Sequence, residues 1–233
     1  MNDLMQKKEW SFNTFAWADE QKLPGFGQLL NSWLQVHKNY CNNVRPENSW
    51  EYDFKERSQI GFLSNAVVLI GGIALEEWAA KKKSGSGNGR NDLFSRLPTQ
   101  NQTQDYFIEA KWGAIDLRWT ENNVVGKLSE VMGNAIKDAE QLDAKHLIPN
   151  DGKAVAVSFF ILSFNDEDAD SLDKTASTLL NYIQGEQSQR LGLNALASIY
   201  FTSEDLKQNR NERKEWPTYE VGLILMAKLV DVT

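Results

Sequence analysis

Apolar residues recur at steps of three and four along several stretches of the chain, which is the spacing that lines one face of a helix. Gly71 and Gly72 follow one such stretch directly, as expected where a helix ends. The pattern is clearest over residues 121–145. It predicts further helices over residues 28–40, 53–70 and 171–182.

Shorter apolar stretches, separated by Gly-rich and polar turns, predict strands. Residues 153–163 are almost continuously apolar, which is typical of a strand buried on both faces. The predicted strands cover residues 73–82, 90–97, 105–113, 153–163, 195–201 and 218–230, with turns at 84–89 and 98–104. From residue 53 the order is helix, strand, strand, strand, helix, strand. This order predicts an α/β fold with a central mixed β-sheet flanked by helices.

The length of 233 residues suits a single domain over residues 1–233. Residues 1–52 form an aromatic-rich N-terminal arm and a helix, residues 53–163 the core, and residues 164–233 a C-terminal extension of the sheet. The arm alternates Trp and Phe with polar residues, so we expect an extended or irregular segment packed on the domain. We also expect the eight tryptophans to lie mostly in the core.

Charge and rare residues exclude several classes of protein. A net charge of −7 argues against a basic protein that coats nucleic acid, although a local basic groove stays compatible with it. The single cysteine, Cys41, excludes an internal disulfide, and two histidines, His37 and His146, argue against a histidine-rich metal site. The chain has neither a signal-peptide pattern nor an apolar stretch of membrane-spanning length, so we expect a cytoplasmic protein with no membrane partner.

Three charged residues fall on two neighbouring predicted strands: Asp92, Glu109 and Lys111. Glu109 and Lys111 are two residues apart, so on a strand they share a face, and Asp92 can lie across from Glu109. Two carboxylates from adjacent strands offer the oxygen ligands that Mg²⁺ or Mn²⁺ prefers. A neighbouring lysine can orient a water and stabilise charge on a phosphodiester. Glu56, at the start of a predicted helix, is the candidate for an additional acid.

Asp92, sixteen further residues and then Glu109-Ala110-Lys111 resemble the core motif of the PD-(D/E)XK nuclease superfamily. The resemblance covers roughly residues 53–163, and it implies a restriction-endonuclease-like fold and a magnesium-dependent endonuclease that hydrolyses DNA. It also implies that Asp92 and Glu109 bind the metal, that Lys111 serves catalysis and that Glu56 contributes. Asn91 stands where this family often has proline.

A basic cluster surrounds the predicted hairpin. It is compatible with two roles, a DNA-facing edge or a charged edge that prevents aggregation. Its members are Lys81, Lys82, Lys83, Arg90 and Arg96.

Each site residue also has a simpler structural interpretation. Glu109 and Lys111 would make a solvated pair on an open sheet, Asp92 suits a turn, and Glu56 suits the first turn of a helix. Glu76 and Glu77 are rival helper acids, of which at most one can reach the site because neighbours on a strand face opposite sides. The alternative function is a catalytically inactive nuclease-fold protein that acts as a binding or interaction module. Its aromatic arm would then dock on a second copy, as in a homodimer, or on a protein partner.

Overall fold

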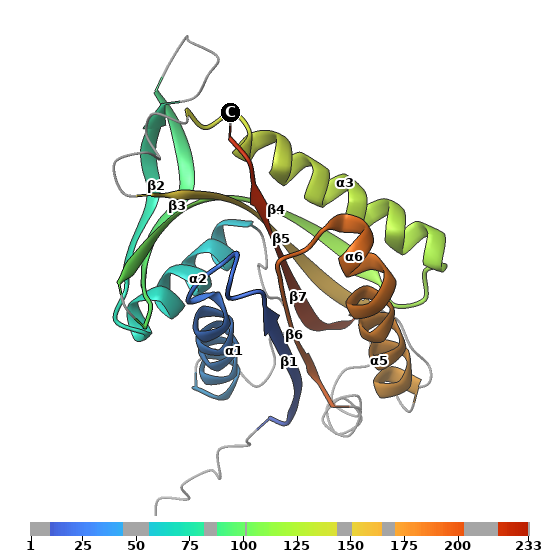
Figure 1. The fold of residues 1–233 in the computed structure, drawn as a ribbon. Coiled ribbons are helices and arrows are strands. Elements are labelled where there is room, and N and C mark those ends of the chain that lie inside the picture. The colour runs from blue at the N-terminus through green and yellow to red at the C-terminus, as the bar shows by residue number, and fades with distance from the viewer. Residues whose placement is uncertain are drawn as a thin grey trace, which may run out of the picture.

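A seven-stranded sheet runs through the computed structural model in the order β1-β6-β7-β5-β4-β3-β2 (Figure 1). The structure describes residues 10–43, 56–81, 88–100, 102–143, 151–164, 171–202 and 219–232. The strands are β1 (Phe12–Ala18), β2 (Ile73–Lys81), β3 (Asn88–Pro98), β4 (Thr103–Asp116), β5 (Lys153–Phe164), β6 (Ala195–Phe201) and β7 (Tyr219–Val230). Strands β4 and β5 pair in parallel and the other neighbours pair antiparallel, so the predicted mixed sheet is confirmed.

Helices cover both faces of this sheet. They are α1 (Phe26–Asn43), α2 (Glu56–Leu69), α3 (Glu121–Ala139), α5 (Leu172–Tyr182), the π-helix η3 (Ile183–Gln187) and α6 (Ser188–Leu191). Helices α1 and α2 lie on one side, and α3 lies on the other (Figure 1). Strand β4 contacts both sides, because its even-numbered Tyr106 ring lies 5.0 Å from Phe26 of α1 and its odd-numbered Lys111 pairs with Asp138 of α3.

Local sequence explains where α2 ends. Gly71 has a φ of +81°, a left-handed conformation that glycine adopts without strain. Gly72 donates its N–H to the carbonyl of Val67 at 2.9 Å and so satisfies a carbonyl of the last helical turn. The predicted helix end is therefore confirmed, and the chain passes directly into β2. Residues 53–55, where this helix was expected to begin, lie outside the described residues.

The helix expected over residues 121–145 is shorter than its pattern indicates, because α3 ends at Ala139. Leu142 lies in the turn that follows and is still only 2% exposed. The apolar spacing continues past the helix end because the turn also packs on the core. Residues 144 and 145 lie outside the described residues.

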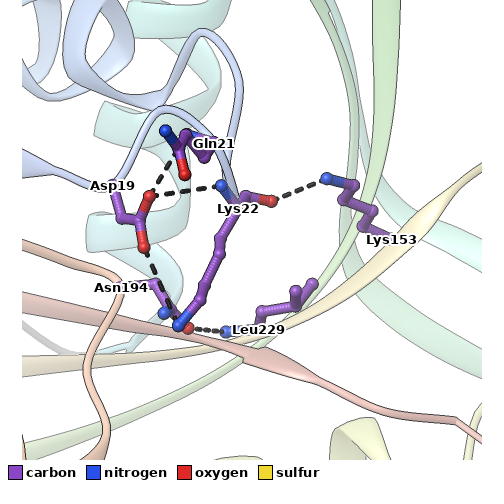
Figure 2. A network of polar contacts seen from close by, with 6 residues as sticks. All are labelled: Asp19, Gln21, Lys22, Lys153, Asn194 and Leu229. Atoms are coloured by element: carbon purple, nitrogen blue, oxygen red, sulfur yellow. Dashed lines mark hydrogen bonds and ion pairs between the residues drawn. The ribbon is translucent and has the colours of Figure 1, made fainter.

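The N-terminal arm is a strand of the sheet. Strand β1 pairs antiparallel with β6 from Phe12/Phe201 to Ala18/Ala195, so the alternating aromatics belong to an edge strand. Polar contacts join the chain after β1 to neighbouring strands, and Figure 2 shows the one between Lys22 and Lys153 of β5. Asp19 donates its N–H to the carbonyl of Asn194 at 2.7 Å, and Lys153 of β5 donates to the carbonyl of Lys22 at 2.6 Å.

The described tryptophans are mostly not core residues, although Trp10 and Trp78 pack against neighbouring rings. Of the six described tryptophans, Trp33 is fully buried, whereas four are at least 40% exposed. The exposed ones are Trp17, Trp78, Trp112 and Trp119. None of the described helices combines the length and the apolar character needed to cross a bilayer.

Candidate active site

Strands β3 and β4 separate at Asp92. Their pairing runs from Pro98/Thr103 to Leu93/Ile108 and stops there. Beyond this point the Oδ2 atom of Asp92 accepts the backbone N–H of Ala110 at 2.8 Å. The carboxylate therefore replaces a hydrogen bond between strands and is fixed against β4.

Glu109 is buried beside this opening, with 2% of its surface exposed. Its Oε1 atom accepts a hydrogen bond from the Nδ2 group of Asn91 at 3.3 Å. Asn91 is fully buried, and its Oδ1 atom has no hydrogen-bond partner among the described residues. Asn91 thus holds the carboxylate of Glu109, and no pattern in the sequence predicts this contact.

Lys111 pairs with an acid that the sequence analysis missed. Its Nζ lies 2.8 Å from Oδ2 of Asp138, in the last turn of α3. Burial alone lowers the pKa of Lys111, but the hydrogen bond to Asp138 and the negative charges of Glu56, Asp138 and Asp92 outweigh it, so the pKa is raised. An acid in the last turn opposes the helix dipole, and this unfavourable position was the available sign that Asp138 has a partner elsewhere.

Glu56, the first residue of α2, belongs to the same charged group. Burial raises the pKa of its carboxyl, Lys111 lowers it, and Asp92 and Asp138 raise it further. The net shift is upward, because the carboxylate is partly desolvated among other acids. Glu56, Asp92, Lys111 and Asp138 therefore lie close enough to influence one another.

The pairing of the strands places Glu109 and Lys111 on one face. Phe94 pairs with Phe107, and these two side chains lie on the face opposite Leu93 and Ile108. Alternation along β4 brings Glu109 and Lys111 to the Phe107 face, and the Asp92 carboxylate lies against the N–H of Ala110, the residue between them. Asp92 therefore contacts the backbone of β4 between Glu109 and Lys111.

The acids suit a hard divalent cation through their oxygen chemistry. Across the described ranges, no three His, Cys, Asp or Glu side chains converge closely enough to surround one ion. Mg²⁺ takes only one or two carboxylates and keeps several waters, so the pair of Asp92 and Glu109 fits it as a donor set.

The expected basic cluster is only partly described. Lys82 and Lys83 lie outside the described residues, as does the side chain of Lys81. Arg96 makes a two-pronged ion pair with buried Asp105, at 2.6 and 2.8 Å, which gives this arginine a structural role. Arg90 is 72% exposed in its side chain and pairs with Glu77 at 2.9 Å.

The two rival helper acids lie away from the motif residues. Glu76 pairs with Leu93, which places it on the face opposite Asp92. Glu77 is exposed and engages Arg90. Neither of them joins the charged group around Lys111.

Replacing Glu56 with Gln is expected to raise the melting temperature at pH 7. The raised pKa means that the folded protein favours the neutral acid, so stability from this group is present below the ordinary pKa and is lost as pH rises through the folded value. The neutral amide of Glu56→Gln does not ionise, so the variant avoids this loss of stability at pH 7. Its higher melting temperature relative to the parent should disappear near pH 4, where Glu56 is protonated. Thermal unfolding of both proteins at the two pH values measures it.

Glu121→Gln, at the first turn of α3, is the matched control for this experiment. The control should not gain stability at pH 7, since it loses a favourable dipole interaction. A Glu56→Gln variant that is less stable than the parent at pH 7 would contradict the desolvated placement of this carboxylate.

Compared with protein-family models, with curated proteins and with solved structures, the chain matches none.

Proposed function

We propose that the protein is a metal-dependent nuclease of restriction-endonuclease-like fold that hydrolyses DNA phosphodiester bonds. The observation that supports this proposal is the hydrogen bond from Ala110 to Asp92, because Ala110 lies between Glu109 and Lys111 on β4. A buried carboxylate beside a partly buried lysine on a sheet is costly for stability alone, which favours a chemical role.

In this proposal Asp92 and Glu109 hold Mg²⁺ or Mn²⁺. The bound ion would supply a water of lowered pKa and would polarise the phosphodiester. Lys111 acts as a cation, since its pKa is raised, and it donates hydrogen bonds from Nζ to the attacking water and to the phosphoryl oxygen that gains charge. The water oxygen bonds to phosphorus and releases a proton to solvent, the bond to the leaving oxygen breaks, and that oxygen takes up a proton from solvent.

The test is cleavage of plasmid DNA with Mg²⁺ or Mn²⁺, with EDTA as the metal-free control. Lys111→Ala should reduce the rate by about a hundredfold, because it removes a donor to developing charge. Lys127→Ala is the matched control: its side chain is 30% exposed against 31% for Lys111, and it likewise pairs with one acid, Glu130 at 3.1 Å. We expect this control to cut at the parental rate.

Two results would overturn the proposal. Cutting that survives Lys111→Ala would point to a contaminant or to another site. No cutting by the parent protein, together with no metal binding in calorimetry, would favour the catalytically inactive interaction module.

A further inference from the structure

A distortion in β2 brings an exposed tryptophan to the face of the proposed site. Glu77 has a φ of +52°, an unusual value for a residue other than glycine. The strand pairs Glu76 with Leu93 and Trp78 with Asn91, so Glu77 lies between two regular pairs. Regular alternation from Leu75, the partner of Phe94, would turn Trp78 to the opposite face. Its ring instead lies 6.0 Å from Phe94, so the distortion re-aims this side chain.

Trp78 begins a row of aromatic rings that crosses three strands. Phe94 lies 5.3 Å from Phe107 in an edge-on contact. We call Trp78, Phe94 and Phe107 the aromatic strip. The strip shares its face with Glu109 and Lys111. Its outer end is open, because Trp78 is 46% exposed.

Two exposed arginines lie around Glu77, the residue before Trp78. Arg90 pairs across the strands with Ala79, one residue beyond Trp78, so alternation places its exposed side chain on the other face of the strands, where it pairs with Glu77. Arg57 of α2 is exposed and acts electrostatically on Glu77. The ion pair of Arg90 with Glu77 is exposed and contributes little to stability, so Arg90 can exchange it for a phosphate.

We propose that the aromatic strip stacks an unpaired base of single-stranded DNA and leads that strand to Asp92, Glu109 and Lys111. This inference rests on the proposed nuclease function and names its substrate class. An exposed ring beside a cation is the combination that holds single strands, because every base offers a face for stacking. In a duplex those faces are already stacked on neighbouring pairs, so the strip selects single-stranded or frayed ends.

Binding without cleavage tests the proposal. A fluorescein-labelled oligonucleotide and the duplex of the same sequence are titrated with the Lys111→Ala protein in EDTA, and anisotropy is recorded. Adding Trp78→Ala should weaken binding of the single strand about tenfold, and it should change duplex binding much less. An oligonucleotide of abasic sugars should show no dependence on Trp78.

Trp17→Ala is the matched control. Trp17 is 44% exposed, close to the value for Trp78, but it lies on β1 at the other edge of the sheet. We expect it to leave both affinities unchanged. Trp78→Phe should restore most of the affinity for the single strand, because it retains an aromatic face.

The inference is overturned if Trp78→Ala weakens both DNA forms equally or neither of them. It is also overturned if the variant only changes the molar mass in light scattering, which would assign the strip to contacts between copies of the chain. Failure of the proposed function is recognised separately, since it appears as absent cleavage in metal and not in these metal-free titrations.

Discussion

Asp92→Asn is expected to reduce metal-dependent DNA cleavage by about two to three orders of magnitude while leaving the fold intact. The amide removes the negative charge that the proposed Mg²⁺ site needs. Its side-chain oxygen can still accept the Ala110 N–H, which Asp92 accepts at 2.8 Å. The variant should therefore lose the cation, measured by calorimetry with Mg²⁺ or Mn²⁺, and keep its melting temperature within a few degrees.

Asp92→Ala separates the chemical role of this residue from its structural role. It removes the carboxylate and also leaves the Ala110 N–H without its acceptor. An unsatisfied donor of this kind costs about 1–3 kcal/mol, so the free energy of unfolding in urea should fall by that amount relative to Asp92→Asn. Equal cleavage by the parent and Asp92→Asn would contradict the metal site. Equal stability of the two variants would contradict the bond to β4.

The stability of the protein is expected to fall steeply as the pH drops from 7 to 5, and His37 is the cause. Its ring is 2% exposed and lies between Trp33 at 4.6 Å and Phe62 at 4.3 Å. Burial is the larger influence and lowers the pKa of His37 to about 3, while the neighbouring Gln59 raises this pKa by a smaller amount. The Nε2 atom of His37 has no hydrogen-bond partner among the described residues. His37 is thus more deeply buried than the partly buried helix residue that its sequence position indicates.

The sign of the effect follows from the lowered pKa. The unfolded chain takes up a proton near pH 6.5 and the folded chain does not, so this group costs stability as the pH falls from 6.5 towards 3. Each pH unit in this range costs about 1.4 kcal/mol, which gives about 2 kcal/mol between pH 6.5 and pH 5. Urea unfolding at pH 7 and pH 5 measures this loss.

His37→Gln should lose about 2 kcal/mol less than the parent between these pH values, since the amide does not titrate. The chain has only one other histidine, His146, which lies outside the described residues. His146→Gln is therefore the natural control, and it should keep the parental slope. If His146→Gln flattens the slope and His37→Gln does not, the assignment to His37 is wrong.

The secondary structure of this protein could be predicted because the spacing of its apolar residues agrees with the positions of the glycines that end its elements. Gly71-Gly72 ends α2 as expected, and the continuously apolar residues 153–163 lie within β5, which has neighbours on both edges. The end of α3 could not be predicted. Leu142 continues the helical spacing while packing from a turn, and periodicity alone does not distinguish these two cases.

The site was predictable only where it depends on alternation along a strand. That alternation gave the shared face of Glu109 and Lys111, whereas Asp138 comes from a helix and enters through tertiary packing. The orientation of Trp78 depends on the positive φ of Glu77. Glutamate rarely adopts a positive φ, so the residue type gives no sign of this backbone conformation. Such departures from regular geometry are the features that a sequence pattern does not record.

The central position of β7 has a consequence for how the chain folds during synthesis. Strand β7 follows every other strand in the chain, yet it lies between β5 and β6. Strands β1 and β6 therefore cannot join the sheet until residues 219–230 have left the ribosome. Because synthesis proceeds at ~5–20 residues per second, one edge of β5 stays unpaired for several seconds before β7 is available. An uncovered strand edge favours pairing between chains, so the nascent chain is most exposed to aggregation during this interval.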